Sequence, residues 1–82
     1  MNIRRHAEQL LDEFYRCVGV KPKHNAIDLQ LEKDNCDKWA GNLNNLLAWG
    51  NDNEIAEACH QLEPRLKKLK ERIIIEVLTH GV

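Results

Sequence analysis

The side chains of this chain that could carry out chemistry are its three cysteines and four histidines, and their spacing forms no recognisable site. Zinc sites and activated thiols usually show close pairs of such residues, for example C-x-x-C or H-x-x-x-H. The only close pair here is Cys59 with His60, whose side chains point about 100° apart on a helix. We therefore predict no metal site and no cofactor.

The cysteines are an odd number and lie far apart, so any intramolecular pairing leaves one over. We interpret Cys17, Cys36 and Cys59 as free thiols buried in a core, as is typical of a reducing compartment. The alternatives are that the three cysteines converge into one site, that two of them form a disulfide, or that one of them is a reactive thiol. Because no uninterrupted apolar segment follows Arg4 and Arg5, we expect no signal peptide and a cytoplasmic protein.

Other kinds of catalysis find no support in the sequence. The chain has no serine, which excludes a serine triad, and it has no glycine-rich phosphate loop. Its paired carboxylates, such as Asp12 with Glu13, are typical of solvated helix faces in a protein with 30% charged residues. We predict that the protein is not an enzyme and has no catalytic residues.

The composition is that of one globular domain covering residues 1–82, because two cores would not fit in this length. The hydrophobic content is 43% and the net charge is −1, so the chain as a whole does not attract nucleic acid. The longest strongly apolar run, Ile73–Ile75, is far too short to cross a membrane. We expect no membrane partner.

Apolar residues at helical spacing predict a first helix over about 2–18 and a second over about 28–49. Asn2 is placed to cap the first helix, and Gly19 to end it in a left-handed conformation. The segment 20–26 contains Pro22 and reads as a connection. The predicted inner faces consist of Ile3, Ala7, Leu10, Phe14 and Val18 in the first helix, and Leu29, Cys36, Trp39, Ala40, Leu43, Leu46 and Leu47 in the second.

A third helix is predicted over about 52–79, after a tight reversal at Gly50 and Asn51. Asn51 and Glu54 have the spacing of a capping box. Pro64 should kink this helix rather than break it, because the apolar period continues on both sides of the proline. A strand over 72–78 is the alternative, because isoleucine and valine favour strands. We predict an all-α, three-helix antiparallel bundle dominated by a helical hairpin of residues 28–79.

The third helix carries a basic stripe, formed by Arg65, Lys68 and Arg72 on one face. Such a stripe could lie along phosphates and give salt-dependent nucleic-acid binding. Glu63, Lys67 and Glu71 are interspersed at four-residue steps, which is equally typical of an ordinary charged helix face. We keep a nucleic-acid-binding accessory protein as the alternative function.

The end of the third helix is apolar almost all round its axis, which a bundle of this size cannot cover completely. We expect Ile74, Ile75 and Leu78 to form a self-association surface, most simply a two-fold homodimer.

Trp49 lies off the inner face of the second helix, beside the reversal. It either contacts a protein partner or folds back over the hairpin end near Ile55. The sequence thus favours a non-enzymatic helical interaction module, such as an adaptor, regulator or inhibitor. It would bind a larger protein of unknown identity and associate with itself.

Overall fold

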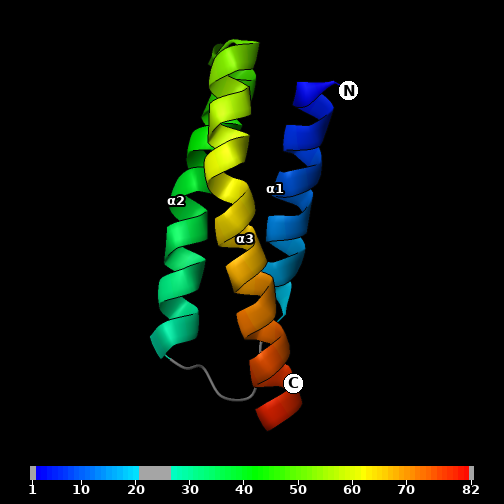
Figure 1. The fold of residues 1–82 in the computed structure, drawn as a ribbon, viewed down its shortest axis with the longest axis vertical. Helices are drawn as coiled ribbons and strands as arrows, with labels where there is room; N and C mark the ends of the chain where they lie inside the picture. The colour runs from blue at the N-terminus through cyan, green and yellow to red at the C-terminus, as the bar shows by residue number, and fades with distance from the viewer. Residues whose placement is uncertain (1, 21–26, 82) are drawn as a thin grey trace.

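The structure is a computed structural model that describes residues 2–20 and 27–81. It contains three α-helices: α1 (Ile3–Gly19), α2 (Ile27–Trp49) and α3 (Asp52–His80). They run alternately up and down in an elongated bundle of 42 × 21 × 17 Å (Figure 1). The described residues contain no strand, so the all-α antiparallel bundle is confirmed and each helix boundary falls within one residue of its prediction. The predicted connection around Pro22 lies outside the described residues.

The N-terminal caps form as the sequence indicates. The Asn2 side chain accepts a hydrogen bond from the Arg4 amide at 3.0 Å. Ahead of α3, the Glu54 amide donates to Asn51 Oδ1 at 2.9 Å, and the Asn51 amide donates to Glu54 Oε1 at 3.1 Å. This reciprocal capping box satisfies two amides that would otherwise lack partners, and it fixes where α3 begins.

The end of α1 differs from its prediction. Gly19 is the last helical residue and has no positive φ, and Val20 follows in an extended conformation. The Val20 amide donates to the Cys17 carbonyl at 3.1 Å, a bond over three residues that tightens the last turn. The left-handed Gly19 cap is therefore wrong, because a tightened turn already satisfies a terminal carbonyl. Among the described residues only Gly81, at the end of α3, has a positive φ, of 81°.

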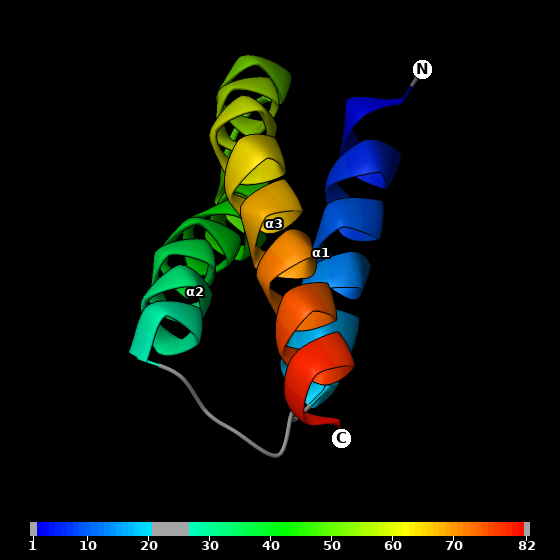
Figure 2. The same ribbon diagram turned by 60° about the horizontal axis from the view of Figure 1, so that its bottom comes forward.

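The core lies along one face of α3, which packs against both other helices (Figures 1 and 2). Most of the predicted inner faces are buried, although Val18 is exposed and four residues are only half-buried, namely Ile3, Trp39, Leu46 and Leu47. The buried hydrophobic residues are Ala7, Leu10, Leu11, Phe14, Leu29, Cys36, Ala40, Leu43, Ile55, Ala58, Cys59, Leu62, Leu66, Leu69 and Ile73.

Helix α3 continues through Pro64 as far as His80. Residues 72–78 are therefore helical, and the strand alternative is wrong. A proline in a helix interior has no amide to donate and its ring crowds the carbonyl four residues before. Packing of the apolar face on both sides of Pro64 outweighs the local cost of the proline.

Candidate interaction surfaces

The described part of the chain contains no cluster of three or more His, Cys, Asp or Glu side chains that could hold a metal ion. Cys36 and Cys59 are buried and Cys17 is half-buried, and all three are free thiols. His60 is exposed beside buried Cys59, so this pair diverges. Burial raises the pKa of each of the three thiols, that of Cys36 to about 11. A nucleophilic cysteine requires the opposite shift.

The basic stripe does not form a free cationic surface. The guanidinium of Arg65 lies over the Trp39 ring, with Cζ 5.0 Å from the centroid. Nη2 of Arg72 lies 2.5 Å from Oδ2 of Asp28, which joins α3 to the first turn of α2. Of the three side chains, Lys68 alone has neither a hydrogen bond, nor an ion pair, nor a ring contact with another described residue, since Arg65 also bonds to Gln61. Two of the three charges therefore serve contacts between helices.

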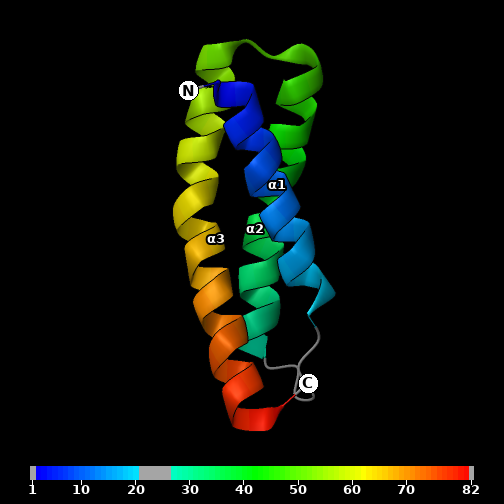
Figure 3. The same ribbon diagram turned by 90° about the vertical axis from the view of Figure 1, so that its right-hand side faces the viewer.

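Large apolar side chains are exposed at one end of the bundle. Figure 3 shows that α1 and α3 end and α2 begins at this end. Ile74, Ile75 and Leu78 are 57%, 51% and 82% exposed, as their all-round apolar segment predicts. We call the full set the apolar end; it consists of Tyr15, Val18, Ile27, Leu31, Ile74, Ile75 and Leu78. The described residues elsewhere expose only one more large apolar side chain, Trp49.

Besides Tyr15 of α1, two members of the apolar end on α2 escaped the sequence analysis, namely Ile27 and Leu31. Their exposed fractions are 80% and 56%. Each lies two residues from Leu29, which is fully buried, and therefore about 200° round the helix from it. The four-residue step between Ile27 and Leu31 places both on one side of α2, and this spacing could have predicted a second apolar face of that helix.

The three predicted self-association residues do not form one flat cluster. Ile74 lines a hollow of about 250 Å³ between α1 and α3, together with Arg16, Cys17, Val20, Lys70 and Ile73. Ile75 and Leu78 do not line it. Ile74 therefore lies at the edge of the exposed side of α3 that is nearest to α1, and Leu78 is the most exposed of the three.

No membrane-spanning candidate exists among the described helices, none of which is both long and apolar enough.

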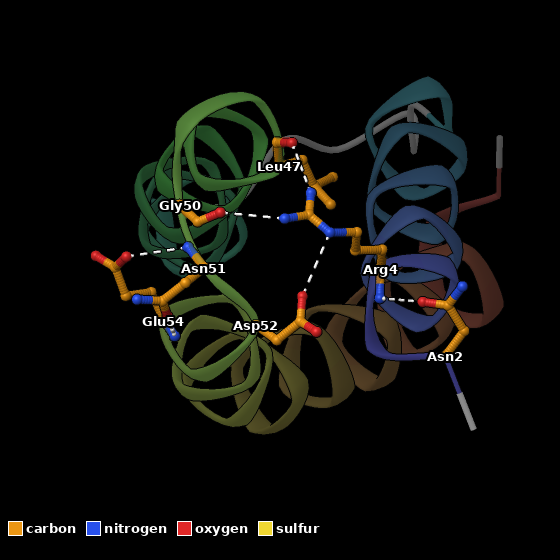
Figure 4. A network of polar contacts seen from close by, with 7 residues as sticks. All are labelled: Asn2, Arg4, Leu47, Gly50, Asn51, Asp52 and Glu54. Carbon is orange, nitrogen blue, oxygen red and sulfur yellow. Dashed lines mark hydrogen bonds and ion pairs between the residues drawn. The ribbon is translucent and has the colours of Figure 1, made fainter.

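At the other end of the bundle, Trp49 is 90% exposed, so it does not fold back over Ile55, which other residues bury completely. The neighbouring turn is held by a polar network that the sequence analysis missed (Figure 4). Arg4 Nη1 donates to the Leu47 carbonyl at 3.0 Å, and Nη2 donates to the Gly50 carbonyl at 3.1 Å. Trp49 thus projects from an ordered helix end.

Two further polar pairs attach α1 to α3. Nε2 of His6 lies 2.5 Å from Oε1 of Glu63, and Nζ of Lys70 lies 2.7 Å from Oε2 of Glu13. Together with the Arg4 contacts they fix the rotation and the height of α1 against the hairpin. These contacts therefore hold the three helices, and with them the two ends of the bundle, in fixed positions relative to one another.

Comparison with known proteins found no match among family models, curated proteins or solved structures. The function has to be inferred from the apolar end and Trp49.

Proposed function

We propose that this protein is a small, non-enzymatic interaction module that binds a larger protein and associates with itself, as an adaptor, regulator or inhibitor does. The observation that carries the proposal is the apolar end. Seven large apolar side chains are exposed there, outside the buried core. Monomeric proteins rarely expose large apolar patches, and burial of such a patch drives association.

Self-association through Ile74, Ile75 and Leu78 is the first half of this proposal. Each of these side chains is more than half exposed, and burying one completely contributes on the order of 1–2 kcal/mol. A two-fold dimer uses the same patch twice, so a few residues per chain suffice.

The free cysteines suit a reducing compartment, and we therefore propose a cytoplasmic location.

Contact with a larger protein through Trp49 is the second half. Tryptophan is enriched among the residues that dominate binding energy at interfaces. Trp49 is the last residue of α2 and Leu78 lies in the last turn of α3, and these helix ends are at opposite ends of the bundle (Figure 3). Both surfaces can therefore be occupied at once. That arrangement suits an adaptor.

Light scattering at concentrations well above the micromolar range tests self-association. The expected mass is twice the 9.5 kDa of the chain. Leu78→Glu should return the mass to that of a monomer, because it places a charge in the interface. Ala48→Glu, which adds the same charge at an exposed helical position near the other end, should leave the dimer intact. A wild-type protein that stays monomeric contradicts this half of the proposal.

Partner capture tests the second half and separates it from the nucleic-acid alternative. A protein retained by wild type but lost with Trp49→Ala supports the proposal. The alternative predicts a salt-sensitive shift of generic DNA or RNA that weakens with Lys68→Ala. A shift of that kind, with no retained protein, overturns protein binding as the main function.

A further inference from the structure

The outward side of α3 carries a regular row of exposed residues at steps of four, three, four, three and four. We call this row the outer stripe; it consists of His60, Pro64, Lys67, Glu71, Ile74 and Leu78, all of them exposed. The spacing is that of a coiled-coil seam, and the row lies opposite the seam that packs in the core. One helix therefore has two contact faces, of which the bundle uses one.

The two halves of the outer stripe differ in shape. The first half lines a shallow hollow of about 430 Å³, formed by His60, Gln61, Glu63, Pro64 and Lys67. The second half presents Ile74 and Leu78, which are 57% and 82% exposed. A second copy running antiparallel would bring Ile74 and Leu78 of each chain over the hollow beside Pro64 in the other.

The charges between the two halves set the register. Lys67 and Glu71 flank residue 69 symmetrically, and neither has an ion pair with another described residue. A two-fold axis near residue 69 places each Lys67 against Glu71 of the partner subunit. The same axis places Ile74 opposite Pro64 of the partner subunit and Leu78 opposite His60 of the partner subunit. Shape and charge thus agree on one register.

The parallel alternative fails on charge. It would align identical residues, so that two lysines and two glutamates face each other at the centre of the stripe. Like charges placed together oppose association, whereas opposite charges favour it and fix the register. The antiparallel arrangement converts both repulsions into attractions.

We propose that the outer stripe is a homodimer interface in which two α3 helices pack antiparallel, with Lys67 of each chain paired with Glu71 of the partner subunit. This inference rests on the proposed self-association, keeps Ile74 and Leu78 in the interface, leaves Ile75 outside it, and adds the orientation and register. The contact extends over about 27 Å of helix. It is small for a protein interface, so dissociation in the micromolar range is expected.

Charge exchange tests the register, with sedimentation equilibrium at low salt as the readout. Lys67→Glu and Glu71→Lys should each weaken dimerisation about tenfold, because each turns two attractions into two repulsions. The double variant Lys67→Glu/Glu71→Lys should restore dimerisation, since the opposite charges then face each other again. An equimolar mixture of the two single variants should associate as well as wild type, whereas each alone does not.

Lys38→Glu is the matched control, because Lys38 is an exposed helical lysine on α2 without an ion pair among the described residues. It should leave dimerisation unchanged, and circular dichroism should show that every variant is folded. Rescue by the double variant and by the mixture supports the proposal. A wild-type dimer that is indifferent to all these changes overturns the register but leaves self-association standing. A wild-type monomer overturns both.

Discussion

Nε of Arg4 lies 3.3 Å from Oδ1 of Asp52, so the first turn of α1 is attached to the first turn of α3 (Figure 4). The same guanidinium donates to the Leu47 and Gly50 carbonyls at the end of α2. Carbonyls at a helix C-terminus lack partners within the helix and carry partial negative charge. One cationic side chain therefore joins all three helices at the end where Trp49 is presented.

Arg4→Ala should lower the free energy of unfolding by about 1 kcal/mol, because it removes two charge-assisted hydrogen bonds and an exposed ion pair. For a domain of this size that corresponds to a fall in Tm of roughly 4–8 °C. Arg5→Ala is the control, since Arg5 is exposed and has no ion pair with another described residue. Equal melting temperatures for the two variants would show that the Arg4 network does not stabilise the fold.

Two glycines of the hairpin should respond in opposite directions to alanine. A Cβ at Gly50 would lie 2.7 Å from Leu46 Cδ2 and 2.9 Å from the Leu46 carbonyl oxygen, so Gly50→Ala should destabilise by roughly 1–3 kcal/mol. A Cβ at Gly41 meets nothing within 4 Å in the middle of α2. Gly41→Ala should therefore stabilise by roughly 0.5–1 kcal/mol.

Urea denaturation of both glycine variants in one buffer measures these changes. If a Cβ at Gly50 crowds Leu46, the free energy of unfolding of wild type lies between those of the two variants. A Gly50→Ala variant as stable as wild type would mean that the turn relaxes around the added methyl group.

Local signals in the sequence were sufficient to place the helices. The capping box of Asn51 with Glu54 and the reversal at Gly50 involve neighbours in the chain, so their spacing alone predicts them. The apolar face of the third helix, from Ile55 to Ile73, was recognisable for the same reason, because a helix fixes which residues share a face.

Contacts between helices could not be predicted in this way. Arg4 reaches Gly50 across 46 positions, and Arg72 reaches Asp28 across 44. Such pairs depend on how each helix is rotated and shifted against its neighbour, which the period of one helix does not specify. Glu76 illustrates a related limit: it is charged but only 7% exposed, and helical spacing alone does not predict its burial.

The buried thiols predict a loss of stability in alkali. Burial raises the pKa of Cys36 from its ordinary 9.0 to about 11, and nearby Glu32 adds to the effect. Between these values the unfolded chain has released the thiol proton while the folded chain keeps it. The unfolded state then binds fewer protons, so the free energy of unfolding falls as pH rises. The decline should begin near pH 9 and continue to about pH 11.

Urea titrations between pH 7 and 11 measure this decline. Cys36→Ala should show a shallower decline than wild type, by at most about 1.4 kcal/mol per pH unit, even though its stability at pH 7 is lower. Identical slopes for the two proteins would show that Cys36 does not contribute to the loss.

Trp49 and Trp39 should be distinguishable by their fluorescence. Trp39 is half-buried under Arg65, whereas Trp49 is 90% exposed at the hairpin end. Iodide should therefore quench mainly Trp49, so Trp49→Phe removes most of the quenchable emission and Trp39→Phe leaves it. Quenching that is lost with Trp39→Phe instead would contradict this assignment.

Trp49→Ala should leave stability within about 0.5 kcal/mol of wild type, because its side chain buries little surface in the folded chain. Its effect should appear in binding, as a loss of more than about 2 kcal/mol in affinity for the captured partner. Thermal melts and a binding titration on the same preparation separate the two properties. A variant that unfolds would make Trp49 structural, and one that binds as wild type does would remove it from the interface.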